Sequence, residues 1–206
     1  VLAAAFNAVK TGLALIDMAR HTGEHPRQGA ADVVPFIPVR EASWEQCIEL
    51  SHRLGRRVGE ELGIPVYLYA KSAQRPERVA LPDIRKGEYE ALAAKLKTPD
   101  FKPDYGPQVF VPKSGVMVTG ARQFLIAYNI NLKTTDVQIA KDIAKLVREK
   151  DGGLPKVQGM GFFLDDKQLS QVSMNLLDFE TTSIRTVFDK VAELAKQKGV
   201  EVAESE

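Results

Sequence analysis

An ordered series of strand and helix patterns in the second half of the chain limits the possible folds more than any other feature. After Phe124 come β-rich and amphipathic helical segments in the order strand, helix, strand, strand, helix. The first strand is FLIAYNINL, and the first helix begins with a capping box at Thr135-Asp136-Val137-Gln138. The next two strands are VQGMGFFL and QLSQVSMNLL, joined by Asp165-Asp166-Lys167. The second helix has Ile184, Val187, Phe188, Val191 and Leu194 on one face. The final VEVAE begins one more strand. The order βαββαβ predicts the ferredoxin-like arrangement, an antiparallel sheet backed by two helices.

The first half alternates helix and strand patterns and ends in a segment rich in proline and glycine. The expected elements begin with a helix over residues 1–19 and, at VVPFIPV, either an edge strand or an irregular extended segment. A helix begun by a capping box at Ser43-Trp44-Glu45-Gln46 and ended at Gly63, a strand at 66–70 and a short helix around 88–96 follow. Because proline and glycine interrupt regular structure, we expect residues 103–120 to form a loop. The chain is thus predicted to be α+β, an α/β sandwich of two subdomains at residues 1–120 and 121–206.

Composition excludes several classes of function. The 28 basic and 27 acidic side chains give a net charge of +1, so no overall field would hold a nucleic acid backbone. No apolar run approaches the roughly 18 to 20 residues that span a bilayer. The single cysteine, Cys47, rules out an internal disulfide and, with no leader in the sequence, indicates a cytoplasmic protein.

Two of the three histidines lie in the short segment His21-Thr22-Gly23-Glu24-His25. Histidine titrates near neutrality and is therefore a candidate general base. The spacing of the pair resembles that of metal ligands on a helix, but Gly23 separates them and Pro26 favours extended backbone at His25. We therefore predict no metal site. From the residues alone, His25 is either a catalytic base or a hydrogen-bonded turn residue.

The loop around residues 106–115 is a second candidate for binding. Its glycines would allow a flat ligand to approach the backbone, and Lys113 and Arg122 could meet carboxylates, although a plain connector between subdomains fits equally well. Gly159-Met160-Gly161 is not followed by a helix start, and neither GxxxxGK[ST] nor GxSxG occurs. Nucleotide binding and serine hydrolase chemistry therefore lose their main support.

The segment from Ile16 to Arg40, IDMARHTGEHPRQGAADVVPFIPVR, closely resembles the signature of the glutamate formimidoyltransferase family, which includes the formiminotransferase part of formiminotransferase-cyclodeaminase. The similarity continues through EELGIPVYLYA, LPDIRKGEYEAL, PDYGPQVFVPKSG, TGARQFLIAYNINL, KVQGMGFFL and QVSMNLLDFE. The resemblance implies two ferredoxin-like βαββαβ subdomains. It also leads us to expect a fragment, since the family begins with a strand-helix-strand-strand segment that has no counterpart here and continues beyond the last strand.

The resemblance implies transfer of a formimino group from N-formimino-L-glutamate to N5 of tetrahydrofolate, the co-substrate, without a metal. It assigns the base to His25 and substrate binding to Arg27 and Arg122. It assigns folate binding to Gly106, Pro107, Gln108, Val109, Phe110, Val111, Pro112, Lys113, Ser114 and Gly115. The family implies a homodimer and a fused or separate cyclodeaminase. Formyl transfer between glutamate and folate, and a folate-binding subunit without catalysis, stay open as alternatives.

Overall fold

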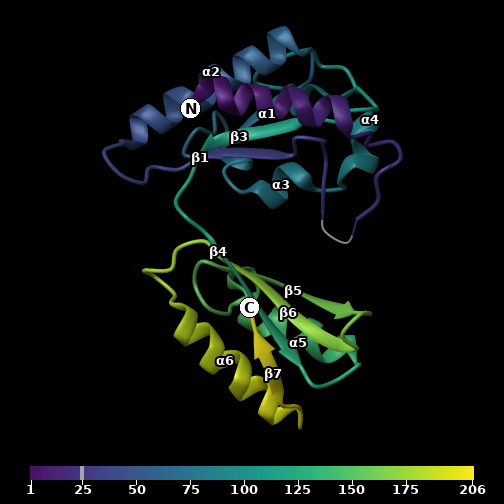
Figure 1. The fold of residues 1–206 in the computed structure, drawn as a ribbon, viewed down its shortest axis with the longest axis vertical. Helices are drawn as coiled ribbons and strands as arrows, with labels where there is room; N and C mark the ends of the chain where they lie inside the picture. Colours follow the sequence, from purple (N-terminus) through teal and green to yellow (C-terminus); the bar gives the residue numbers. More distant parts are fainter. Residues whose placement is uncertain (24–25) are drawn as a thin grey trace. The chain divides into compact units, whose positions relative to one another are not determined.

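The computed structural model describes residues 1–23 and 26–206, which divide into two compact units, Val1–Arg122 and Gln123–Glu206 (Figure 1). Each unit combines helices with its own β-sheet, so the predicted α+β class is confirmed.

The sheet of the first unit has three strands that all pair in parallel. They are β1 (Val33–Phe36), β2 (Val66–Ala70) and β3 (Met117–Ala121), in the order β1-β3-β2. Of the two structures expected for the proline-containing segment, the edge strand is confirmed, because among the described residues β1 pairs on one side only. The ferredoxin-like arrangement predicts antiparallel pairing in this half as well, and these three strands differ from it.

The loop predicted for residues 103–120 is wrong at its C-terminal end, because β3 is the central strand of the sheet. Every residue of β3 is buried, as is usual for a central strand of a parallel sheet. Gly120 marks a close approach of two strands: a Cβ there would lie 2.3 Å from the carbonyl oxygen of Tyr69. Glycine thus lets two strands pack here, and its presence does not indicate a loop.

Helices cover both faces of this sheet (Figure 1). They are α1 (Leu2–Leu15), α2 (Trp44–Glu61), α3 (Leu81–Arg85) and α4 (Leu92–Lys95), with short 3₁₀ turns at Pro76–Arg78, Tyr89–Ala91 and Pro99–Phe101. The capping box of α2 is confirmed, since Gln46 N–H donates to Ser43 Oγ and Ser43 N–H donates to the Gln46 side chain. The helix predicted around 88–96 is shorter than expected, and α3 was not predicted.

Alternation along the strands divides the core of the first unit into two clusters. Val66 and Met117 face α1 and α2, where Phe6, Val9, Leu54 and Val58 pack. Tyr67 and Val118 face the opposite side, where Ile84, Leu92 and Leu96 pack. Successive strand residues point to opposite faces, so one short strand contributes to both clusters.

The second unit has the predicted order βαββαβ, with an antiparallel sheet of strand order β5-β6-β4-β7. Its elements are β4 (Ile126–Leu132), α5 (Val137–Val147), a 3₁₀ turn at Glu149–Asp151, β5 (Val157–Leu164), β6 (Leu169–Leu176), α6 (Ile184–Gln197) and β7 (Val202–Ser205). Both helices share one core cluster with the sheet. Two details differ from prediction: Asp136 caps α5 in place of Thr135, and Ile184 is exposed because it begins α6 directly after its Ser183 cap.

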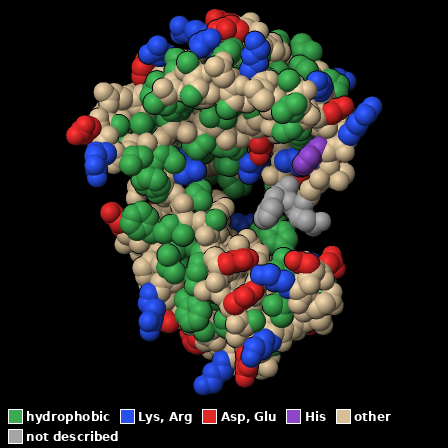
Figure 2. Space-filling view, viewed as in Figure 1, with side chains coloured by type: hydrophobic (Ala, Val, Ile, Leu, Met, Phe, Trp, Pro, Cys, Tyr) green, Lys and Arg blue, Asp and Glu red, His purple; other side chains and the backbone are tan. Residues whose placement is uncertain are grey.

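The surface carries mixed charge. On the face seen in Figure 2, basic and acidic side chains are interspersed over the units, in keeping with a net charge of +1. None of the helices in the described ranges combines the length and the apolar composition needed to cross a bilayer.

Candidate functional site

Two of the segments predicted to form the site meet at a pair of glycines in the first unit. Gly29 and Gly115 form an isolated antiparallel bridge. Beside it, Ala30 N–H donates to Ser114 O at 2.9 Å and Val116 N–H donates to Gln28 O at 3.0 Å. A Cβ on Gly29 would lie 1.8 Å from Val116 O, so any other residue would force the segments apart. The chain just after His25 is thereby fastened to the end of the loop 106–115.

The loop 106–115 is held by contacts along its length. Gly106 has φ +79° and packs so closely on α2 that a Cβ on Gly59 would lie 2.5 Å from its nitrogen. The Gln108 side chain donates to the carbonyls of Leu96 and Thr98, at 3.1 and 2.8 Å. Lys113 Nζ donates to Ala14 O at 3.2 Å. Among these anchored residues, Val109 stands out to solvent.

Tyr89 connects the two candidate segments. Its backbone N–H donates to Arg27 O at 2.9 Å, and its hydroxyl donates to Pro112 O at 2.7 Å. Its ring lies 5.5 Å from that of Phe110. Burial raises the pKa of the Tyr89 hydroxyl above its ordinary value of 10.0, so the hydroxyl keeps its proton over a wider pH range. Sequence reasoning missed Tyr89, because nothing local in the sequence indicates that the turn 89–91 reaches both segments.

Arg27 is already engaged by the protein. Its guanidinium donates to both carboxylate oxygens of Glu90, at 2.8 and 3.2 Å, and to His21 O at 3.0 Å. The bond to Glu90 raises the pKa of Arg27 and lowers that of Glu90. The side chain of Arg27 therefore connects residue 27 with the backbone of residue 21 and with the turn 89–91.

A second ion pair, Asp32 with Arg85, lies next to Gln28 beside the bridge. Asp32 accepts a hydrogen bond from Gln28 N–H at 3.0 Å and pairs with Arg85 of α3. Arg122, at the end of β3, donates from Nε to the Tyr69 hydroxyl at 3.1 Å. Arg85 was not predicted, since its pairing with Asp32 depends on tertiary packing over 53 positions of the chain.

Several buried polar atoms of this region have no hydrogen-bond partner within the described part of the chain. They are Arg27 Nε, both polar ends of the Gln28 side chain, Arg85 Nε and Ser114 Oγ. Buried polar groups are usually hydrogen-bonded, so such a gathering requires an explanation.

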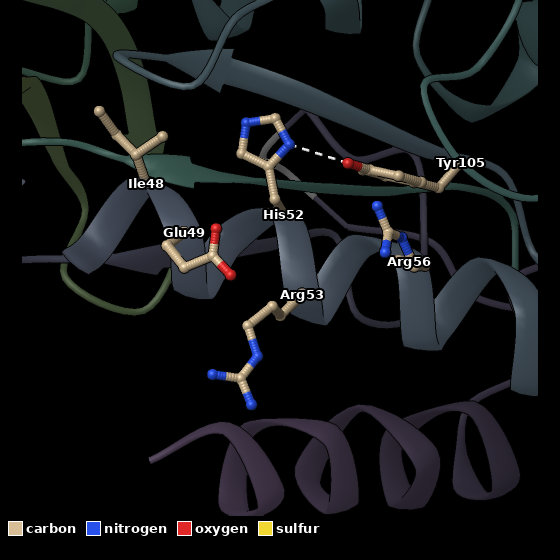
Figure 3. A pocket seen from close by; sticks show the side chains of 6 residues that line it. All are labelled: Ile48, Glu49, His52, Arg53, Arg56 and Tyr105. Carbon is tan, nitrogen blue, oxygen red and sulfur yellow. Dashed lines mark hydrogen bonds between the residues drawn. The ribbon is translucent and has the colours of Figure 1, made fainter. Parts of the chain in front are cut away.

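His25 lies outside the described residues, as does Glu24. Of the other two histidines, His21 is exposed, and His52 lies in a cavity of about 340 Å³ on the outer side of α2 (Figure 3). There the His52 ring points to Tyr105, with Nδ1 and the hydroxyl oxygen 2.8 Å apart. His52 is thus a partly buried packing residue.

Within residues 1–23 and 26–206, no group of three or more histidine, cysteine, aspartate or glutamate side chains could hold a metal ion.

Comparison with known protein families identifies the class to which this chain belongs. A family model described as the formiminotransferase domain, N-terminal subdomain, matches residues 1–122, and one described as the formiminotransferase domain matches residues 127–206. The chain belongs to the formiminotransferase family.

Named relatives agree with that assignment. A glutamate formimidoyltransferase of Thermoplasma acidophilum is 50% identical over 98% of this chain and 67% of its own length. One of Streptococcus pyogenes serotype M1 is 43% identical over 98% of this chain and 68% of its own length. A formimidoyltransferase-cyclodeaminase of Mus musculus is 51% identical over 100% of this chain, which spans 39% of that relative.

Proposed function

We propose that the protein transfers the formimino group of N-formimino-L-glutamate to N5 of tetrahydrofolate, giving 5-formiminotetrahydrofolate and L-glutamate, as a step of histidine degradation. The observation that carries this proposal is the match of both formiminotransferase family models along the chain. The relatives named glutamate formimidoyltransferase, which align over two thirds of their length, support it.

In this proposal His25 is the general base. N5 must lose a proton as it bonds to the formimino carbon, and an imidazole titrates in the right range to accept that proton and return it to the departing glutamate nitrogen. One positioned base contributes about 10² to 10⁴ in rate. The anchoring of the flanking chain by Arg27 supports this role, because a base acts only when its position is held.

The loop 106–115 is proposed to bind the folate. The support is its attachment to the segment after His25 through the Gly29–Gly115 bridge and through Tyr89. Holding folate beside the base supplies rate by proximity. Lys113 and Arg122 are proposed to meet substrate carboxylates. Arg27, which sequence resemblance also assigned to substrate, is better proposed as a positioning residue because Glu90 already binds it.

Partners and location are proposed from the family alone. The Mus musculus relative is named for a cyclodeaminase as well as a formimidoyltransferase, and we propose that such an enzyme, fused or separate, receives the product. A homodimer in the cytoplasm is proposed on the same basis, and sedimentation of the full-length protein would test the dimer.

The test is a coupled measurement of glutamate release by the full-length protein. We expect release from N-formimino-L-glutamate only when tetrahydrofolate is supplied. Release without folate would contradict the proposal. Faster turnover of N-formylglutamate would favour formyl transfer, and folate binding without turnover of either donor would favour a binding subunit.

A further inference from the structure

The cavity on the outer side of α2 has no part in the proposed reaction. Its volume of about 340 Å³ lies at the lower end of the roughly 300 to 1,000 Å³ usual for pockets that hold small molecules. Helix residues three or four positions apart are neighbours on the helix surface, so α2 brings several charged and polar side chains together here. The cavity is lined by Tyr105 and five residues of α2, namely Ile48, Glu49, His52, Arg53 and Arg56 (Figure 3).

The two arginines of the cavity are not engaged by acidic groups. Within the part of the chain that the structure describes, Arg53 and Arg56 are exposed and take part in no ion pair. The recorded contact of Arg56 is with the ring of Tyr105, whose centroid lies 5.9 Å from the guanidinium carbon. The next residue along α2, Arg57, is by contrast paired with Glu61 at 2.6 Å. The guanidinium donors of Arg53 and Arg56 are therefore available to a ligand.

His52 adds a further polar group to the cavity. Its Nδ1 lies 2.8 Å from the hydroxyl oxygen of Tyr105. When this hydroxyl donates the bond, Nδ1 is the acceptor, and the hydrogen of the neutral ring is carried by Nε2. The bond to Tyr105 thus leaves Nε2 as a donor for a ligand beside the two guanidinium groups.

The charge of the cavity favours an anion. The two guanidinium groups outnumber the single carboxylate, that of Glu49, so one positive charge is left over. A carboxylate has two oxygens, and one guanidinium can satisfy both. A phosphate group has at least three acceptor oxygens and a charge of about −1.5 to −2 at neutral pH, so it can accept hydrogen bonds from both guanidinium groups and the imidazole at once.

We propose that this cavity is a binding site for a small molecule that carries a phosphate group. In this proposal Arg53, Arg56 and His52 donate hydrogen bonds to the phosphate oxygens, and Glu49 opposes its binding. The site does not depend on the proposed formimino transfer, because none of these four residues is assigned to the substrates or to the base.

The test is calorimetric titration of the full-length protein in phosphate-free buffer of low ionic strength. We expect saturable binding of one inorganic phosphate per chain at this cavity. Arg53→Gln and Arg56→Gln should each weaken binding about tenfold, because each removes charge-assisted hydrogen bonds. Glu49→Gln should strengthen binding severalfold, since it removes the opposing charge.

Arg57→Gln is the matched control. It changes the net charge by the same amount on the same helix, but Arg57 pairs with Glu61 and lies over the ring of Phe6 of α1, 4.0 Å from its centroid. We therefore expect phosphate affinity to be unchanged in Arg57→Gln, even where the melting temperature falls.

Two other anions identify the form of the ligand. Tighter binding of glycerol 3-phosphate than of inorganic phosphate would indicate a phosphate ester, and the reverse order would indicate the free ion. Either order supports a phosphate site. Malonate carries two carboxylates, and it should bind more weakly than both.

Several results would overturn the site. They are the absence of saturable binding of both phosphates, unchanged affinity in Arg53→Gln and Arg56→Gln, an equal loss of affinity in Arg57→Gln, and tighter binding of malonate. Displacement of phosphate by tetrahydrofolate or N-formimino-L-glutamate would show that it occupies the substrate site, which also refutes the proposal. Each of these outcomes leaves the proposed formimino transfer standing, because that function is tested by glutamate release.

Discussion

The guanidinium of Arg27 binds the carbonyl of His21 and the carboxylate of Glu90 at the same time. The first bond links Arg27, which follows residues 24–25 in the chain, to His21, which precedes them. The second bond links Arg27 to the turn 89–91. A planar group with several fixed donors is suited to this task, and a lysine could not make the same set of bonds. At the scale of single residues, these bonds support the proposal that Arg27 is a positioning group.

Glu90→Gln tests that role without touching Arg27. Glutamine binds the guanidinium more weakly, so we expect kcat to fall roughly tenfold while KM for N-formimino-L-glutamate stays unchanged. If Arg27 instead bound a substrate carboxylate, releasing it from Glu90 would change KM. The matched control is Glu61→Gln, which weakens the Arg57–Glu61 pair on α2 and should leave both constants unchanged.

His25→Ala tests the proposed base. We expect turnover to fall by about 10² to 10⁴ while the melting temperature and the affinity for tetrahydrofolate are retained. His21→Ala is the control, because its known contact is through the backbone carbonyl, which alanine keeps. Unchanged turnover in His25→Ala would remove this residue from the mechanism.

Sequence patterns predict only some of the residues of the candidate site. The segment 21–32 and the loop 106–115 could be singled out from histidine, glycine and proline. Arg85, Tyr89 and Glu90 could not, since each acts on residues more than 20 positions away through packing. The unpartnered carboxamide of Gln28 is likewise invisible in a sequence, because burial and hydrogen bonding are properties of the folded chain.

At the scale of elements, local patterns predicted most helices and strands, and failed where a tertiary contact decides the structure. The order of elements in the second unit follows from periodicity and caps that lie within each segment. The strand β3 was missed because a glycine such as Gly120 usually indicates a break in regular structure. Only the folded chain shows that Gly120 is needed for the close packing of β3 against Tyr69. The parallel pairing of β1, β3 and β2 is also a property of the assembled sheet.

The junction of Gly29 with Gly115 is the contact between elements that matters most for the site. Gly29→Ala would place a Cβ 1.8 Å from Val116 O, and we expect the free energy of unfolding to fall by roughly 3 kcal/mol, at the upper end for overpacking. Gly12→Ala in α1 is the control, because the added Cβ would lie at an ordinary contact distance of 3.6 Å from Ala30 O. Alanine favours the helix more than glycine does, so the free energy of unfolding should stay the same or rise by up to about 1 kcal/mol. Urea unfolding measures both, and equal stabilities would contradict the packing described here.

The strand β2 gives a prediction for alkaline pH. The Tyr67 hydroxyl donates to Phe101 O at 2.8 Å, and burial raises its pKa above the ordinary value of 10.0. Above pH 10 the unfolded chain loses this proton while the folded chain keeps it, so the free energy of unfolding falls as pH rises, by about 1.4 kcal/mol per unit. Below pH 10 both states hold the proton and the contribution is constant.

Tyr67→Phe should flatten this alkaline decline. At pH 8 the variant should be less stable by about 1 kcal/mol for the lost hydrogen bond. Urea unfolding at pH 8, 9, 10 and 11 should then show the two proteins converging as pH rises above 10. Parallel pH profiles would show that Tyr67 does not carry the predicted shift.

At the scale of the whole molecule, the two units correspond to different family models. Residues 1–122 match the N-terminal subdomain and residues 127–206 match the second model, and the chain spans about 39% of the Mus musculus relative. The site described here lies within the first unit. Activity is therefore a property to be measured on the full-length protein.

The most direct measurement follows the carbon that moves. The full-length protein is mixed with tetrahydrofolate and N-formimino-L-glutamate labelled with ¹³C in the formimino group, and the label is observed by NMR. We predict that the label becomes bonded to N5 of the folate as an equal amount of glutamate appears. Label released into water as formamide or formate, with no folate adduct, would contradict the account.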